Sequence, residues 1–145
     1  MEVNLDHLTN IINLEYMLRI LIAVIFGFCI GLERELTNKY AGLRTHILVC
    51  LGACVFTLIS IYGFPTFATG DNVIVDQATG IRDTSRVAAQ IVTGIGFIGA
   101  GTVLRNGPIV LGLTTAATLW IAASIGMACG AGMYEIAFAG TLLSI

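Results

Sequence analysis

The sequence predicts an all-α, polytopic membrane protein built as a bundle of about five transmembrane helices. Of its 145 residues, 57% are hydrophobic and only 11% are charged, whereas a soluble domain carries about 25% charged residues. The apolar residues form long stretches, and a helix needs about 20 of them to cross the hydrocarbon core of a bilayer. Most of the 17 glycines lie inside these stretches, as is typical of helices that pack closely in lipid.

Five segments are expected to form the helices. They are residues 16–32, 43–62, 86–104, 109–129 and 133–145. At about 1.5 Å per residue, the last segment is about 20 Å long, which is too short to span the core. The expected connections are a short basic loop at 37–42, a long polar loop at 63–85, a four-residue turn at 105–108 and a glycine turn at 130–132. We expect a single transmembrane domain over residues 1–145, without a C-terminal soluble domain.

The distribution of Lys and Arg predicts the orientation, because cytoplasmic loops carry an excess of these residues. The first and third connections with their edges hold four of them, Arg34, Lys39, Arg44 and Arg105. The long loop with its edge holds two, Arg82 and Arg86, and the N-terminal tail holds none. We therefore expect the N-terminus and the long loop outside the cell, and the first and third connections in the cytoplasm.

Glycines at helical spacing predict the surfaces through which the helices pack, within the chain or in a homodimer. Gly94 and Gly101 share one face of the third segment, and Gly96 and Gly99 share the opposite face, so this helix is expected to be central and held from both sides. The full set of predicted packing positions is Gly27, Gly31, Gly94, Gly96, Gly99, Gly101, Gly112 and Gly126. Residues 94–99 also match GxGxxG, but a dinucleotide site needs that motif between a strand and a helix, so we reject this interpretation.

Charged residues at the ends of the apolar segments need a partner or a function, because a charge at the bilayer centre costs roughly 2.5–3.5 kcal/mol. Glu33, Arg34 and Glu35 end the first helix, and Arg44 and His46 begin the second. Across the short connection, these groups are expected to form a hydrogen-bonded network. Ordinary interfacial charge explains them equally well, and the functional alternative is a docking surface or an ion-gating cluster.

A second polar set leads into the third helix. Asp83 is expected to cap the helix just before Arg86, and Gln90 is expected to form an interhelical hydrogen bond. Asp83, Gln90 and Arg105 share one helical face with two of the glycines, and the functional alternative is a polar path or recognition seam along that face.

Two further charges are expected to form an ion pair near the outer surface. Glu15 and Arg19 stand four residues apart on the first helix, with the acid first, which is the favourable order. Glu135, at the start of the last segment, is a second possible partner for Arg19. The simplest role for this pair is a structural clamp.

The sequence favours neither an enzyme nor a cofactor or metal site. The threonines in residues 114–118 have no base nearby in the sequence and are expected to bond to helix carbonyls. His46, Cys50 and Cys54 share one face of the second helix, but one helix rarely supplies three ligands to a soft metal. The cysteines are expected to be packing residues, and a net charge of −2 argues against a nucleic-acid partner.

Three stretches, in this order, resemble the signatures of the MgtC/SapB family. The first comprises GLERE at 31–35, AGLRTHILV at 41–49 and LGA at 51–53. The second runs from 83 to 105 and contains RVAAQ at 86–90 and the glycine block, and the third is GLTTAATLW at 112–120. The likeness extends over most of the chain, from about residue 31 to residue 132.

The resemblance implies a bacterial inner-membrane protein with a five-helix N-terminal domain. It also implies a link to growth under magnesium limitation and, in pathogens, to survival inside macrophages. Better-studied members look like regulators that bind other membrane proteins, including the F-type ATP synthase, rather than pumps. The polar positions of the first two signatures correspond here to Glu33, Arg34, Glu35, Arg44, His46, Asp83, Arg86 and Gln90. Many members add a soluble C-terminal domain, and Thr84 stands where proline is common.

Two functions follow as hypotheses. The first is a membrane-embedded regulatory or interaction protein, a homodimer that acts through helix–helix contacts and has no enzymatic activity. The alternative is a carrier or channel for Mg²⁺ or another small cation, suggested by the two polar sets. Mg²⁺ needs oxygen ligands in near-octahedral order, and Asp83 is the single carboxylate on the polar face of the third helix, so we rank this alternative second.

Overall fold

The computed structural model describes residues 5–63, 83, 85–106 and 108–145. Within them the expectation of an all-α protein is confirmed, with five helices and one small pair of strands. The elements are α1 (Leu5–Leu36), α2 (Leu43–Tyr62), α3 (Ser85–Gly101), β1 (Leu104–Asn106), β2 (Ile109–Leu111), α4 (Leu113–Gly130) and α5 (Tyr134–Ser144). Most of the expected loop at 63–85, including Arg82, lies outside the described residues, as does the start of the N-terminal tail.

Three of the helices are long and apolar enough to cross a membrane. They are the Leu14–Leu36 part of α1, all of α2 and all of α4, which makes the chain a multi-pass membrane protein. α3 has 17 residues, one fewer than α4 and at the lower limit for a spanning helix. α5 has 11 residues and is about 16 Å long, which is too short to cross the roughly 30 Å of the hydrocarbon core. The bundle thus has the five expected helices, of which three are candidate membrane spans.

The connection between α3 and α4 differs from the expected four-residue turn. β1 and β2 pair antiparallel, with Leu104 opposite Leu111 and Asn106 opposite Ile109. As a result, α3 ends at Gly101 and α4 begins at Leu113, and the residues between them leave the two predicted helices. The β-branched side chains of Ile109 and Val110 favour extended backbone, which an apolar count along the sequence does not distinguish from helix.

α1 is longer than the expected segment at both ends. It begins at Leu5 rather than at residue 16, and it continues to Leu36 rather than ending at residue 32. A helix satisfies its backbone hydrogen bonds internally, so it can continue past the apolar stretch into the polar interface. Its polar last turn, residues 33–36, is therefore placed directly against the start of α2.

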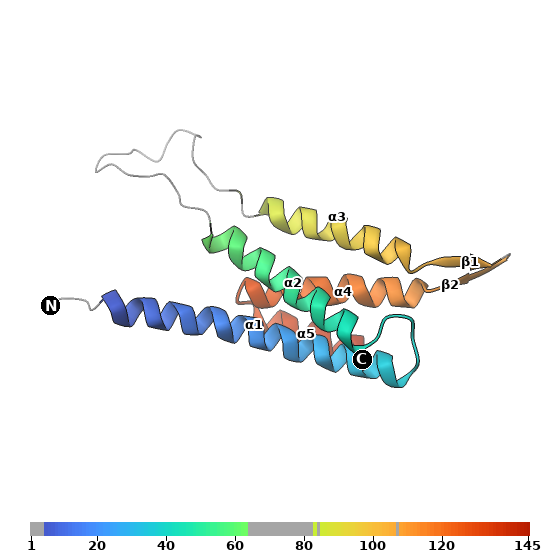
Figure 1. Cartoon of the computed structure of the whole chain (residues 1–145), viewed down its shortest axis with the longest axis horizontal. Helices are drawn as coiled ribbons and strands as arrows, with labels where there is room; N and C mark the ends of the chain where they lie inside the picture. The colour runs from blue at the N-terminus through green and yellow to red at the C-terminus, as the bar shows by residue number, and fades with distance from the viewer. Residues whose placement is uncertain (1–4, 64–82, 84, 107) are drawn as a thin grey trace.

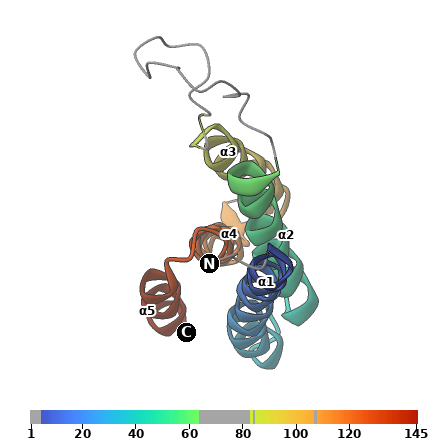
Figure 2. The ribbon, with the colours of Figure 1, turned by 90° about the vertical axis from the view of Figure 1, so that its left-hand side faces the viewer.

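α4 is the centre of the bundle. It contacts each of the other four helices, and Figure 2 shows α5 on one side of it and α1 and α2 on the other, with α3 at the edge. Its buried residues are mostly small, including Ala122, Ala123 and Gly126, which lets neighbouring backbones come close. The expectation of a central third helix was wrong within this chain, because Gly99 of α3 meets α4 while a Cβ at Gly94, Gly96 or Gly101 would meet nothing within 4 Å.

The helices define two ends of the bundle (Figure 1). We call the end where α1 finishes and α2 begins the α1–α2 end, and the end where α2 finishes and α3 begins the α2–α3 end. The strands lie beyond the α1–α2 end, because α3 runs toward it and α4 runs back from it.

Candidate functional site

The start of α2 is capped by a side chain from the last turn of α1. The Glu35 carboxylate accepts a hydrogen bond from the Leu43 backbone N–H through Oε2 at 3.0 Å. The cap residue Gly42 supplies no side-chain hydrogen bond, and a Cβ at Gly42 would overlap the Glu35 carboxylate. An anion near a helix N-terminus is favourable, so Glu35 serves the helix start and Gly42 makes room for it.

His46 is fully buried between α2 and α4 and lies in a hydrogen-bonded chain. Its Nδ1 is 2.9 Å from the Gly42 carbonyl oxygen, and its Nε2 is 3.3 Å from Thr118 Oγ1. A carbonyl only accepts, so Nδ1 donates to it, and in a neutral ring Nε2 is then an acceptor that the Thr118 hydroxyl can reach. The same hydroxyl lies 3.0 Å from the Thr115 carbonyl oxygen, so it has two alternative acceptors.

Arg34 is the most enclosed charge at the α1–α2 end. Its side chain is 7% exposed, and its Nη1 is 3.7 Å from Glu33 Oε2. Two of its nitrogen atoms, Nε and Nη2, are buried and have no hydrogen-bond partner within the described chain. A buried positive charge repels a cation beside it. The position of Arg34 therefore argues against the ion-gating alternative for this cluster.

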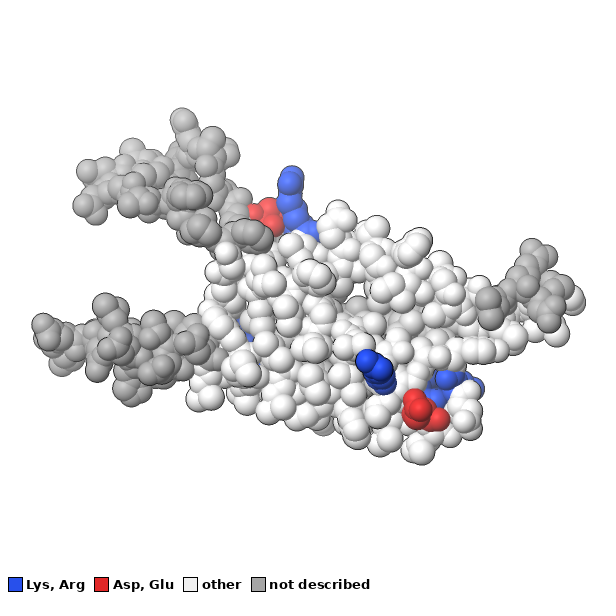
Figure 3. Space-filling model, in the orientation of Figure 1, with Lys and Arg blue, Asp and Glu red and all other residues white. Residues whose placement is uncertain are grey.

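The predicted polar cluster is divided between the two ends. The α1–α2 end holds five of its members, Glu33, Arg34, Glu35, Arg44 and His46. Among the described residues, the expected hydrogen-bonded network does not join the side chains of the first three to those of Arg44 and His46, since Glu35 bonds to the Leu43 backbone and His46 to the Gly42 carbonyl. Asp83 and Arg86 lie at the start of α3, at the other end, and Figure 3 shows the two groups of charges apart on the surface. This division agrees with the orientation expected from the sequence, in which the first connection and the long loop lie on opposite sides of the membrane.

At the start of α3, the expected cap is present. Asp83 Oδ1 accepts hydrogen bonds from the Ser85 backbone N–H at 3.1 Å and from the Ser85 hydroxyl, and its Oδ2 is 3.6 Å from Arg86 Nε. The Ser85 hydroxyl is the main reason why the pKa of Asp83 lies below its ordinary value. Both carboxylate oxygens are thus engaged by the first residues of its own helix, as capping requires.

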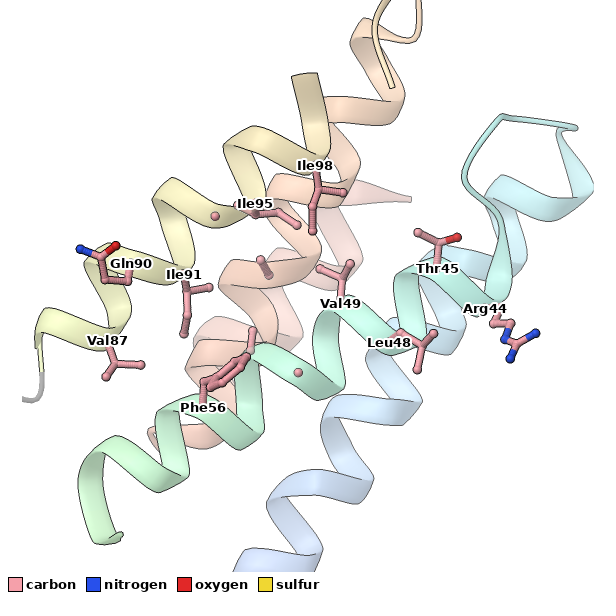
Figure 4. A pocket seen from close by; sticks show the side chains of 14 residues that line it. Arg44, Thr45, Leu48, Val49, Phe56, Val87, Gln90, Ile91, Ile95 and Ile98 are labelled. Carbon is pink, nitrogen blue, oxygen red and sulfur yellow. The ribbon is translucent and has the colours of Figure 1, made fainter. Parts of the chain in front are cut away.

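Gln90 lines a groove between α2 and α3, with Ala123 of α4 among its lining residues. The groove has a volume of about 670 Å³, and its lining is apolar apart from Gln90, Thr45 and Arg44. In Figure 4, Phe56, Val49 and Ile91 face the space between the helices, whereas the Arg44 side chain extends away from α3 at one end. The expected interhelical bond of Gln90 is absent from the hydrogen bonds of the described residues. The side chain of Arg105 lies outside what the structure describes.

The predicted packing glycines serve three different purposes. At Gly27 and Gly126 a Cβ would press into α2, since it would lie 2.9 Å from the His46 carbonyl oxygen and 3.0 Å from Ala53 Cβ, respectively. Gly31 approaches Leu43 in the same way. These three glycines therefore hold α1 and α4 against α2, as the sequence predicts for packing positions.

The remaining glycines differ from one another. Gly99 contacts Ala116 of α4, with a Cβ distance of 3.5 Å, while a Cβ at Gly94, Gly96 or Gly101 would meet nothing within 4 Å. Gly112 was expected in helix packing, but it caps α4 in the left-handed region with φ 88°, where glycine is favoured. One face of α3 therefore packs on α4, and the rest of its glycines are open.

Arg19 contacts residues of three different segments, of which the sequence predicted one. Its predicted ion pair with Glu15 is present, and its Nη1 also donates to the Gly130 carbonyl oxygen at 2.7 Å. Its guanidinium carbon lies 5.7 Å from the centre of the Tyr62 ring. Ion pairs among the described residues do not include Arg19 with Glu135. The spacing of Glu15 and Arg19 was the only signal, since the other partners come from distant segments.

The metal alternative on α2 has no support in the geometry. His46, Cys50 and Cys54 are all buried, but no three His, Cys, Asp or Glu side chains in the described ranges are grouped so that they could hold a metal ion. Cys50 Sγ instead donates to the Ala122 carbonyl oxygen at 3.1 Å. These side chains pack α2 against α4.

Comparison with known proteins gives consistent relatives. Residues 20–145 match the family described as the MgtC family. The chain is 44% identical to YhiD of Escherichia coli K12 over 131 residues, which are 90% of this chain and 58% of that protein. It is 44% identical to MgtC of Salmonella typhimurium LT2 over 128 residues, 88% of this chain and 48% of the relative.

A relative from Bacillus subtilis shows the same relationship. SapB of Bacillus subtilis is 42% identical over 132 residues, 88% of this chain and 53% of the relative. The chain thus spans about half the length of the curated relatives that it matches. No solved structure matches the chain at a significant level. The match over residues 20–145 and the identity to these relatives establish that the chain belongs to the MgtC family.

Proposed function

We propose that this chain is a regulatory or interaction protein of the bacterial inner membrane, which acts through helix contacts with a second copy or with another membrane protein. The observation that carries the proposal is the open glycine face of α3. A Cβ at Gly94 or Gly101, which share this face, would meet nothing within 4 Å, and Phe97, between them in the sequence, is 84% exposed. Small residues on a membrane helix allow another helix to approach its backbone closely.

The remaining chemistry of the chain supports an interaction role rather than catalysis. Several polar groups at both ends of the bundle serve caps and helix contacts, such as Glu35 on Leu43 and Arg19 on Gly130. We infer that the protein is not an enzyme. Its role in adaptation to low magnesium, and in intracellular survival for a pathogen, is proposed from the resemblance to the family.

The proposed partners are a second copy and other membrane proteins, among which the F-type ATP synthase is suggested by the same resemblance. The proposed orientation has the N-terminus outside the cell and the α1–α2 end in the cytoplasm. Arg34, Lys39 and Arg44 all lie at or beside that end, in agreement with the excess of basic residues in cytoplasmic loops.

The test is photo-crosslinking in native membranes. The photoreactive residue p-benzoylphenylalanine replaces Phe97, and in a matched control it replaces Phe138, which is exposed on α5. We expect light to produce a homodimer or an adduct with a second membrane protein from position 97, identified by mass spectrometry, and much less from position 138. If position 97 gives no protein adduct, or if both positions give the same adducts, the proposal fails.

A second candidate function is transport of Mg²⁺ or another small cation. It is favoured by the name of one relative, "Putative magnesium transporter YhiD", and by Gln90, which lines the groove between α2 and α3. Purified protein in liposomes should then move Mg²⁺, and Gln90→Leu should abolish the flux. Flux that depends on Gln90 would reverse the ranking of the two functions, while an absence of flux with crosslinking from position 97 would support the first.

A further inference from the structure

We propose that the groove between α2 and α3 binds an acyl chain of an anionic phospholipid, with the phosphate group of that lipid at Arg44. The groove includes Gly94, which also belongs to the open glycine face used in the function proposed above. The inference is based on the length and volume of the groove, on the chemistry of its lining and on a cation at one end that forms no ion pair among the described residues.

The groove has the length and volume of a ligand site. Along α2 its lining residues extend from Arg44 to Phe56, which is roughly 18 Å of helix. Its volume of about 670 Å³ lies within the roughly 300–1,000 Å³ that is typical of small-molecule sites. An extended acyl chain can therefore lie along the groove between the two helices.

The lining of the groove is suited to lipid along its length. Leu48 and Phe56 of α2 and Ile91 and Ile98 of α3 present apolar side chains to it (Figure 4). Gly52 and Gly94 have no Cβ, and neither position has an atom within 4 Å of where a Cβ would stand, so these two residues keep the groove open. A site of this size, with apolar walls and few polar groups, is typical of small-molecule sites.

The charge at one end selects the kind of lipid. Arg44 is exposed at the first turn of α2, the start of an apolar helix long enough to cross a membrane, and among the described residues it forms no ion pair. Its neighbour Glu35 already accepts the hydrogen bond from Leu43. Basic residues beside pockets between transmembrane helices bind anionic headgroups. In Figure 4 the Arg44 side chain extends outward past Leu48. It can therefore meet a lipid headgroup that lies outside the groove while the acyl chain lies inside it.

The experiment is native mass spectrometry of the whole chain purified in mild detergent. Equal amounts of dioleoyl-phosphatidylglycerol and dioleoyl-phosphatidylcholine are added, so that the two lipids differ only in the headgroup. We expect a preference for phosphatidylglycerol of about fivefold, which corresponds to the roughly 1 kcal/mol that one basic residue contributes near anionic lipid. Arg44→Gln should remove the preference, while Arg86→Gln, at the other end of the bundle, should retain it.

Filling the groove gives the second part of the test. Gly94→Leu places a side chain in the groove and should reduce binding of both lipids, whereas Gly96→Leu adds the same side chain to α3 outside the lining residues and should leave binding unchanged. Gly52→Leu fills the groove from α2 and replaces Gly94→Leu if that variant does not fold.

Two results would overturn the proposal. One is equal retention of the two lipids by the unmodified chain. The other is equal lipid binding by the Gly94 and Gly96 variants. If Gly94→Leu converts dimers to monomers and leaves lipid binding unchanged, the groove holds a second copy of the chain and the lipid assignment is wrong.

Discussion

Arg19 of α1 donates a hydrogen bond of 2.7 Å to the carbonyl oxygen of Gly130, the last residue of α4. The last carbonyls of a helix have no partner within the helix, and a cation is favourable there. Arg19 therefore satisfies the end of the central helix from a different helix, while Glu15 balances its charge.

We expect Arg19→Met to destabilise the fold by about 2 kcal/mol, because a hydrogen bond to a charged group contributes about 1.5–3 kcal/mol. A fluorogenic maleimide reports unfolding on heating in detergent, since Cys50, Cys54 and Cys129 are buried in the folded chain. Arg86→Gln, which changes an exposed arginine, is the control. Equal melting temperatures for the two variants would show that the Gly130 contact contributes nothing.

The contrast between two glycines gives a prediction about packing. Gly126→Ala should destabilise the protein by about 1–3 kcal/mol through overpacking, because the new Cβ would overlap the Cys50 carbonyl oxygen. Gly94→Ala, where nothing lies within 4 Å, should be neutral or stabilising by up to about 1 kcal/mol, since alanine favours helix. The thiol assay measures both, and a stabilising Gly126→Ala would contradict the close approach of α4 to α2.

The partner of the buried histidine can be removed with almost no change in shape. Thr118→Val leaves His46 Nε2 without its contact at 3.3 Å, and an unsatisfied buried polar group costs about 1–3 kcal/mol. We expect a corresponding fall in thermal stability. Thr114→Val, an exposed change on the same helix, should have little effect. If the two variants have the same melting temperature, the contact of His46 with Thr118 does not contribute to stability.

The cap of α3 predicts a pH dependence with a definite sign. The pKa of Asp83 is lowered chiefly by the Ser85 hydroxyl, so the stabilisation by the cap is present at neutral pH and is lost as the pH falls through the lowered pKa. Carboxyl NMR of labelled aspartate in detergent should show a midpoint for Asp83 below the ordinary 3.8. Ser85→Ala should raise that midpoint, and an unchanged midpoint would argue against the hydroxyl as its cause.

Local patterns predicted what depends on local sequence. Three such features were expected: the bounds of α2 at residues 43 and 62, the ion pair of Glu15 with Arg19, and the cap by Asp83. Each depends on residues that are close together in the sequence. Hydropathy did not separate β1 and β2 from the ends of α3 and α4, since apolar strand and helix residues are much alike over three positions.

Contacts between distant segments were beyond local patterns. His46 and Thr118 stand 72 residues apart, and Arg19 and Gly130 stand 111 apart. Periodicity shows which residues share a face, but not which face another helix covers. The open and the packed glycines of α3 are therefore alike in sequence and differ only in the fold.

The hydrogen bond between the Glu35 carboxylate and the Leu43 backbone N–H couples the end of α1 to the start of α2. The first turn of α2 cannot unwind without freeing a group that belongs to the final turn of α1, and α1 cannot fray at that end without exposing the bare amides of α2. Movement at the α1–α2 end therefore involves both helices, so a partner that displaces one of them also displaces the other.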